Sequence, residues 1–356
     1  MPRKLLILGG TGSIGLGLRK KASQNTDFDI TFTSRSLKNE PLKNETLVVG
    51  NAKDPEFLAR LLESENWDIV LDLMVYKTDQ FQKVLNRLLD NTNLYIFVSS
   101  ARVYQPTSEL INEKSKRLLD VSSDAKYLST KEYALEKARQ ENLLIENKRT
   151  NWTIIRPYIT FNHNRLQLGA YEKEEWLYRA LAGKKIPLPL ELLNLHTTIT
   201  SADEVAYILY ELLNSKDIKM ETFNLVNPKY LPWSEILKIY EKVFREATQL
   251  DLPVLLLPAR DLHGCHRGKY QLTMDRLHNR RFQTEKIEKF CGNINYSEPS
   301  EQLELKFKAF LNFPSFGDIS AKHEGSKDRV TQQPWSIKSL SGMKAKIKYI
   351  KGRLLL

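Results

Sequence analysis

One tyrosine and one lysine, spaced four residues apart, could carry proton-transfer chemistry in this chain. They are Tyr127 and Lys131, at the start of a segment, 128–147, whose residues favour a helix. This spacing puts both side chains on one helix face. Because an ammonium group beside a phenol favours the phenolate, we expect the pKa of Tyr127 to fall and Tyr127 to act as acid and base. Ser100, which follows an apolar run, could hold a substrate oxygen at the same point.

A second pair with the same spacing, Tyr133 and Lys137, lies in the same segment. The chain has 15 tyrosines and many lysines, so this spacing also arises by chance. Tyr127 lies at the entrance of the predicted helix, near the carboxyl ends of the predicted strands, whereas Tyr133 lies further along it. We therefore interpret Tyr127 and Lys131 as the reactive pair, and Tyr133 as a packing or surface residue.

A glycine-rich turn near the N-terminus could hold a dinucleotide. The turn contains Gly9, Gly12 and Gly15. It follows an apolar run over 5–8 and precedes a helical pattern over 14–23. The first glycine permits the tight turn, the second admits phosphates to the backbone N–H groups, and the third lets the helix pack against the strand, so the pyrophosphate would lie at the positive end of the helix. The further contacts expected from this turn are those of Thr11, Ser13 and Ile14.

The residues after the second predicted strand favour NADP over NAD. An NAD site usually has an acidic residue here, which accepts a hydrogen bond from the ribose 2′-hydroxyl. This chain has Ser34 and Arg35 instead. Because an arginine can pair with a 2′-phosphate and offset its charge, we expect NADP as the cofactor. Asn51, after the third predicted strand, could hydrogen-bond the adenine.

An α/β scaffold would bring these residues together. Apolar runs typical of strands occur at 5–8, 28–33, 46–49, 67–73, 95–98 and 152–156, and they alternate with helical patterns. This alternation predicts a doubly wound, Rossmann-like parallel sheet, with a smaller mixed C-terminal region for substrate. The expected parts are a dinucleotide-binding domain over 1–160 with returning segments to about 230, a substrate-binding region over 161–315, and a basic tail over 316–356.

At these motifs the chain resembles the extended short-chain dehydrogenase/reductase family, which includes the NAD-dependent epimerases and dehydratases of nucleotide sugars. The family's Ser-Ser-x-x-Val-Tyr motif matches residues 99–104, and its Tyr-x-x-x-Lys motif matches Tyr127 and Lys131. Its Arg-Pro dipeptide matches residues 156–157. The resemblance implies a nucleotide-sugar substrate, Ser100 as the catalytic serine, and Lys131 as a ligand of the nicotinamide ribose.

The resemblance also narrows the reaction. The dehydratase branch carries an Asp-Glu pair directly after the catalytic serine, where this chain has Ala101 and Arg102. Neither residue can be the general acid or base of an elimination, so we expect a reductase, or an epimerase that acts through a transient keto sugar. The chain also resembles a divergent branch that includes chloroplast stem-loop-binding proteins. A non-catalytic RNA-binding protein of the same fold is therefore the alternative.

Charge and composition limit the possible partners and the possible location of the protein. The formal net charge is +11, and no acidic residue follows Asp328. The C-terminal stretch is therefore interpreted as a solvated tail or as a contact to an anionic membrane surface or acidic partner, with nucleic acid the less favoured partner. Two cysteines, no apolar run of ~18 residues and an N-terminus without a leader are typical of a cytoplasmic protein.

We expect no metal and a homodimer. Four potential ligands cluster in one basic segment without the spacing of a metal site. They are His263, Cys265, His266 and His278. The arginines of that segment are better suited to a substrate diphosphate. Many relatives in the family pair through two long helices, which here would be 78–90 and 128–147.

Overall fold

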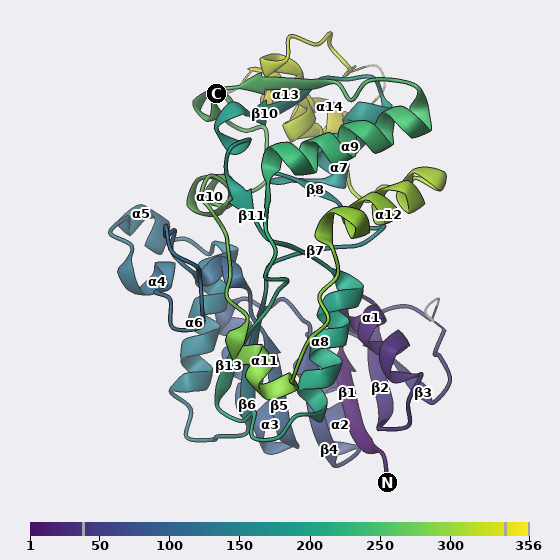
Figure 1. The fold of residues 1–356 in the computed structure, drawn as a ribbon, viewed down its shortest axis with the longest axis vertical. Coiled ribbons are helices and arrows are strands. Elements are labelled where there is room, and N and C mark those ends of the chain that lie inside the picture. The colour runs from purple at the N-terminus through teal and green to yellow at the C-terminus, as the bar shows by residue number, and fades with distance from the viewer. Residues whose placement is uncertain (38–39, 338–339, 355–356) are drawn as a thin grey trace.

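The centre of the molecule is a seven-stranded parallel sheet (Figure 1). The structure is a computed structural model that describes residues 1–37, 40–337 and 340–354. The strands are, in spatial order, β13 (Glu221–Leu225), β6 (Trp152–Pro157), β5 (Thr92–Val98), β4 (Trp67–Asp72), β1 (Arg3–Leu8), β2 (Phe28–Ser34) and β3 (Glu45–Val49). The strand order reverses between β1 and β4, and ligands of such sheets bind at the carboxyl ends of the strands at that point.

Helices cover both faces of the sheet, which explains why its strands are continuous apolar runs. In β1, Ile7 packs on the face of α1 and α8, while Leu8 packs on the opposite face, against α2 and α3. These helices are α1 (Ser13–Ala22), α8 (Ala202–Asn214), α2 (Pro55–Glu63) and α3 (Thr78–Asp90), with α6 (Tyr133–Ile145) beside α3. The doubly wound, Rossmann-like fold predicted from the sequence is thus confirmed.

A second core lies beyond the sheet, at the upper end of the molecule in Figure 1. It is mixed, with several helices and short strand pairs around Trp176, Trp233 and Phe307, which are buried. Its helices are α7 (Lys173–Leu181), α9 (Trp233–Thr248) and α12 (Pro299–Asn312). Its strand pairs are β7 (Ile159–Phe161) with β12 (Ile199–Ser201), β8 (Gln167–Leu168) with β9 (Tyr171–Glu172), β10 (Ile186–Pro189) with β15 (Val254–Leu257), and β11 (His196–Thr197) with β14 (Leu231–Pro232).

The segment predicted as one helix over 128–147 is divided in two. A short helix, α5 (Ala125–Leu128), ends before Ser129, and α6 begins only at Tyr133. Glu132 is the N-cap of α6, and its carboxylate accepts a hydrogen bond from the backbone N–H of Ala134 at 2.6 Å. Tyr133 is therefore the first residue of the long helix, the position that the sequence analysis gave to Tyr127.

The basic C-terminal stretch is a packed pair of helices rather than a solvated tail. It contains α13 (Ala321–Val330) and α14 (Met343–Leu354), at the end of the molecule opposite the N-terminus (Figure 1). Asp328 is fully buried, lies 2.8 Å from the Arg179 guanidinium, and accepts a hydrogen bond from the Tyr349 hydroxyl at 2.7 Å. A Cβ on Gly352 would collide with the Lys322 carbonyl, so glycine sets the close crossing of the two helices. Among the described residues, no helix is long and apolar enough to cross a membrane.

Candidate active site

Two cavities form one groove across the carboxyl ends of the strands. Their volumes are about 410 and about 400 Å³, and they share Gly9, Leu73 and Val75. The first contains four further residues of the glycine turn, namely Gly12, Ser13, Ile14 and Gly15. The second contains Thr11, Ser34, Arg35 and Asn51. The groove thus brings together every predicted cofactor residue except Lys131.

The glycine turn has the geometry that a pyrophosphate needs. Gly9 has a φ of +79°, which favours glycine, and a Cβ on Gly15 would come within 2.9 Å of the Gly10 backbone. A Cβ on Gly12 would instead point into open space, with its nearest neighbour, the Gly9 carbonyl oxygen, 3.9 Å away. Helix α1 starts here with no acidic residue in its first turn and no side-chain cap, so its N–H groups are available to an anion. These residues fit a dinucleotide.

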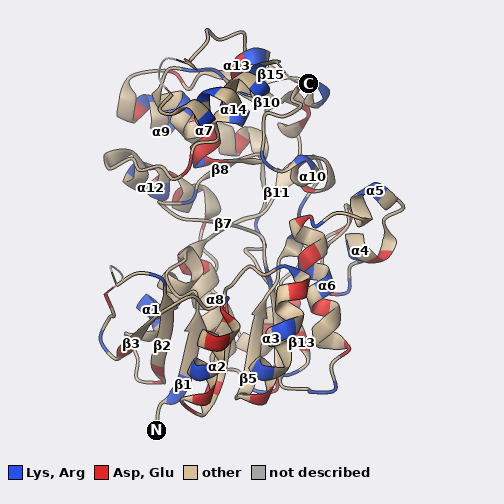
Figure 2. Ribbon diagram, turned by 180° about the vertical axis from the view of Figure 1, so that it is seen from behind, with Lys and Arg blue, Asp and Glu red and all other residues tan. Residues whose placement is uncertain are grey.

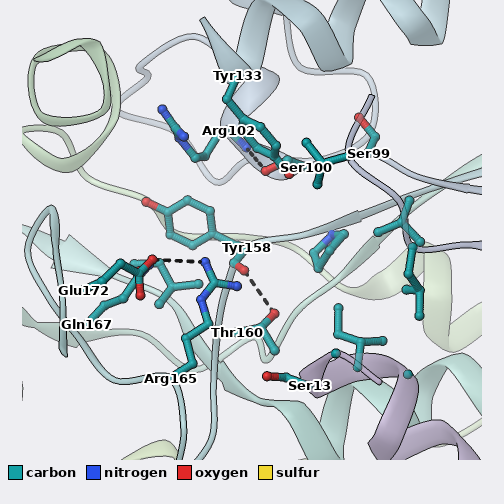
Figure 3. Close-up of a pocket in the computed structure, with 18 of the residues that line it drawn as sticks. Ser13, Ser99, Ser100, Arg102, Tyr133, Tyr158, Thr160, Arg165, Gln167 and Glu172 are labelled. Atoms are coloured by element: carbon teal, nitrogen blue, oxygen red, sulfur yellow. Dashed lines mark hydrogen bonds and ion pairs between the residues drawn. The ribbon is translucent and has the colours of Figure 1, made fainter. Parts of the chain in front are cut away.

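Tyr133 and Ser100 enter the first cavity together. Figure 3 shows both side chains on one side of the cavity, across from Ser13 at the start of α1. The Ser100 hydroxyl lies near the Tyr133 phenol, where it lowers the pKa of Tyr133. Ser100 ends the loop after β5, where its hydroxyl also accepts a hydrogen bond from the backbone N–H of Arg102 at 3.3 Å. A hydroxyl and a phenol are therefore directed at the same space as the glycine turn.

Lys137 lies one turn after Tyr133 on α6 and is buried. Its ammonium group donates hydrogen bonds to the carbonyls of Val98, at 2.7 Å, and Met74, at 3.4 Å. Val98 lines the first cavity and Met74 the second, whereas Lys137 itself lines neither. Burial lowers the pKa of Lys137 to about 8, against the opposing effect of the Asp72 carboxylate.

The expected pair of Tyr127 and Lys131 is not on one helix face, and that prediction is wrong. Tyr127 belongs to α5, is fully buried, and packs its ring against Tyr270 with centroids 4.8 Å apart. Its hydroxyl has no hydrogen-bond partner among the described residues, and burial raises its pKa rather than lowering it. Lys131 lies between the two helices with its side chain exposed. Neither residue lines the groove.

Arg102 acts on the electrostatics of Tyr133. Burial raises the pKa of Tyr133, while the guanidinium groups of Arg102 and Arg165 and the Ser100 hydroxyl oppose that rise. The Arg102 guanidinium lies 5.4 Å from the centre of the Tyr133 ring, and it is held by an ion pair to Glu132 at 2.6 Å. Arg102 is thus fixed beside the Tyr133 ring.

The far end of the cavity, toward the C-terminal region, is lined by polar side chains. Arg276, one of the arginines considered for a substrate diphosphate, donates hydrogen bonds to Tyr158 at 2.9 Å and to Gln167 at 3.1 Å. Arg280 pairs with Asp275 at 2.8 Å and is fully buried. Arg165 has a half-exposed side chain that lies 3.4 Å from Glu172 (Figure 3), so it is the arginine most available to a ligand. Arg165 was not among the predicted site residues, although it follows the loop after the Arg-Pro dipeptide.

The comparisons with known proteins agree with this geometry. Residues 9–180 match a family model described as NAD(P)H-binding. The chain carries an NAD(P)H-binding domain. Its fold is shared with solved nucleotide-sugar epimerases and a dehydratase, which is the fold that the resemblance in the sequence predicted.

Two solved structures illustrate the shared fold. A UDP-N-acetylglucosamine 4-epimerase from Methanobrevibacter ruminantium M1, in complex with UDP-N-acetylmuramic acid, is similar over 87% of this chain and 99% of its own, with a TM-score of 0.66 and 17% identity. A UDP-glucuronic acid 4-epimerase from Bacillus cereus, in complex with NAD, is similar over 87% of this chain and 98% of its own, with a TM-score of 0.64 and 13% identity.

One relative by sequence is a stem-loop binding protein. The chloroplast stem-loop binding protein of 41 kDa b from Arabidopsis thaliana is 29% identical to this chain over 263 residues, which is 67% of this chain. The chain spans 63% of the length of that relative. The NAD(P)H-binding domain thus occurs on a fold shared with epimerases, in a chain similar in sequence to a stem-loop binding protein.

Proposed function

We propose that this protein is an NAD(P)-dependent enzyme that oxidises or reduces a nucleotide-activated sugar, as a reductase or as an epimerase that acts through a keto sugar. One observation carries the proposal: a single cavity holds the start of α1, Ser100 and Tyr133. The first binds a pyrophosphate, and the other two can bind and deprotonate a hydroxyl group. Such a set is needed for hydride transfer at a carbinol carbon and is superfluous in a protein that only binds RNA.

The roles follow from the positions of the side chains. Ser100 holds the reacting oxygen of the sugar, and the Tyr133 phenolate accepts the proton of that hydroxyl as the carbon is oxidised. The bound nicotinamide supplies the acceptor or donor of the hydride. In reduction, Tyr133 returns the proton to the oxygen. Lys137 is a buried cation one turn along α6, and we assign it the supporting role of favouring the phenolate.

The same geometry disfavours a dehydratase. After Ser100 come Ala101, which is fully buried, and Arg102, which is paired with Glu132. Neither side chain has an acidic proton to give to a leaving hydroxyl group. The reaction we propose therefore ends at the oxidation or reduction of the sugar, or at the inversion of one carbon.

Arg35 is expected to select NADP. It lies in the second cavity with Asn51, on an exposed loop after β2, where it can pair with a 2′-phosphate. We expect Arg35→Ala to weaken the binding of NADP⁺ roughly tenfold and to leave the affinity for NAD⁺ nearly unchanged. The reason is that only NADP⁺ carries the 2′-phosphate with which Arg35 would form a charge-assisted pair. Calorimetric titration with both dinucleotides measures this, and equal losses would remove Arg35 from the 2′-phosphate site.

The pH dependence of turnover is expected to depend on Arg102. Its positive charge lowers the pKa of Tyr133 against the effect of burial, so Arg102→Met should raise that pKa. The rise of the oxidation rate with pH would then move to higher pH in the variant. A pH profile of kcat for the variant and the unmodified enzyme measures the shift, and Arg260→Met, at an exposed arginine outside the groove, is the control. An unchanged profile would show that Arg102 does not act on the base.

The enzyme proposal is tested by a panel of nucleotide sugars. The protein is incubated with NAD⁺ or NADP⁺ and with UDP- and dTDP-activated hexoses, and nicotinamide absorbance and product chromatography are followed. Reduction of the cofactor, or conversion of one sugar to its epimer, supports the proposal. No conversion of any sugar by protein that binds the cofactor would contradict it.

The second candidate is a stem-loop RNA-binding protein without sugar chemistry. It is favoured by the 29% identity to the chloroplast stem-loop binding protein and by the net charge of +11. Selective binding of a stem-loop RNA that persists at raised salt, together with no dinucleotide binding, would support this candidate and overturn the first.

A further inference from the structure

Helix α14 has two different faces. Tyr349 and Gly352 are buried against α13, and Arg353 stacks over Trp335 at 5.1 Å from the ring centre. The opposite face carries Met343, Ile347 and Leu354, which are 71%, 47% and 65% exposed. An ordinary surface helix has one apolar stripe and buries it. Here the buried face already anchors the helix, so the outer apolar stripe has no role in folding.

The outer stripe is continuous along the helix. Met343, Ile347, Ile350 and Leu354 follow one another at intervals of four, three and four residues, which places them in one row. Exposing a row of aliphatic side chains to water costs free energy, because apolar area is stabilised when it is removed from water. This cost is relieved only when another surface covers the row. The row therefore marks a contact surface.

Cations flank the row on both sides. Lys344, Lys348 and Lys351 are exposed along one edge, while Lys346 and Arg353 lie along the other. No acidic residue occurs after Asp328, and Asp328 is itself buried in its pair with Arg179. Figure 2 shows this concentration of positive charge on α14. The partner must therefore offer negative charge at its surface and apolar groups behind it.

We propose that the outer face of α14 docks on an anionic lipid surface, with Met343, Ile347 and Leu354 inserted among the headgroups and the flanking cations at lipid phosphates. An apolar row between cations is the pattern of helices that lie in the plane of a membrane. The row is aliphatic, so it provides no stacking surface for RNA bases, and a lipid surface is favoured over a nucleic acid. Trp335, which is 50% exposed at the edge of this face, has the amphipathic ring that is common at such interfaces.

The place of α14 is compatible with function in the docked state. Helices α13 and α14 form the end of the C-terminal region that lies away from the sheet (Figure 1). No α14 residue lines the dinucleotide groove, so docking through this face leaves the groove open. The inference goes beyond the proposed function, since it concerns where the protein acts and not what it catalyses.

The test is co-sedimentation of the full chain with vesicles. One vesicle type contains equal parts of phosphatidylcholine and phosphatidylglycerol, and the other contains phosphatidylcholine alone. We expect binding to the anionic vesicles only, weakened by added salt. Loss of three lysines, in K344Q/K348Q/K351Q, should weaken the partition coefficient about 100-fold, at about one factor of five per charge. Ile347→Gln, which keeps every charge, should weaken it roughly tenfold.

The control removes the same charge elsewhere. Lys148, Lys216 and Lys219 are exposed and lie outside α14, so K148Q/K216Q/K219Q should bind vesicles like the unmodified chain. All substituted side chains are exposed, and thermal melting checks that each variant is folded like the unmodified chain. If the control variant lost as much vesicle binding as K344Q/K348Q/K351Q, the loss would be due to net charge alone, and the proposal would be overturned. The absence of vesicle binding would also overturn the proposal. So would a dimer, detected by light scattering without vesicles, that the Ile347→Gln substitution dissociates. A third contradicting result is that α14 is needed for binding stem-loop RNA and not for binding lipid.

Discussion

Tyr133→Phe is expected to lower kcat about 1,000-fold while leaving dinucleotide affinity nearly unchanged. The phenol lies in the same cavity as Ser100 and can carry the substrate proton, and phenylalanine keeps the ring but not the oxygen. The measurement is kcat on the nucleotide sugar found in the panel, with dinucleotide binding measured separately.

The matched control is Tyr127→Phe. Tyr127 is fully buried and its hydroxyl has no partner among the described residues, so the loss of that oxygen costs neither a hydrogen bond nor catalysis. Its kcat should stay within about twofold of the unmodified enzyme. A loss of activity in Tyr127→Phe with full activity in Tyr133→Phe would reverse our assignment of the base.

Glu141→Ala is expected to destabilise the protein by about 3–5 kcal/mol. Glu141 is fully buried and accepts hydrogen bonds from Arg156 at 2.8 and 2.6 Å and from Arg117 at 3.1 Å. Its removal would leave the Arg156 guanidinium, which is 4% exposed, without its carboxylate. Urea unfolding followed by tryptophan fluorescence measures the loss. The same change should disturb Ser99, which hydrogen-bonds Glu141 next to Ser100.

The pH dependence of this pair has a definite sign. Burial alone would raise the pKa of Glu141, but the Arg156 guanidinium, the Ser99 hydroxyl and the Arg117 guanidinium together outweigh burial, and the pKa is lowered. The pair therefore contributes its stability above the pKa of an unfolded glutamate, about 4.3, and loses it as the pH falls through the lower folded value. Lys242→Ala, which breaks an exposed pair with Glu304 at 2.9 Å, is the control and should cost less than about 1 kcal/mol. If Glu141→Ala and Lys242→Ala lost similar amounts of unfolding free energy, burial would not be what makes the Glu141 pair important for stability.

The sequence predicted the fold well because its signals are local. The glycine turn and the apolar runs each specify one strand, turn or helix, and their alternation leaves few arrangements of a parallel sheet. Gly9, Arg35 and Asn51 were correctly placed in one groove because each follows a strand, and strand ends meet at one edge of the sheet.

The interpretation of Tyr127 as the entrance of the long helix was wrong for a reason that is also local. It depended on where one helix begins, and a shift of a few residues decides which of two identical spacings lies at the entrance. Ser129 and Thr130 are of the residue types that commonly cap a helix, so they signalled an N-terminus near Tyr133. The packing of Tyr127 against Tyr270 depends on a contact between distant parts of the chain, which spacing alone does not predict.

The account rests most directly on dinucleotide binding at the start of α1, which a titration with NADPH and NADH tests. The unmodified protein should bind at least one of them, with nicotinamide fluorescence as the readout. Gly12→Asp is the decisive variant, because its Cβ would face open space and aspartate is a good N-cap, so the fold should persist. Its carboxylate would occupy the place of the phosphates and should abolish binding at an unchanged melting temperature. No binding to the unmodified protein, or equal binding to Gly12→Asp, would contradict the account.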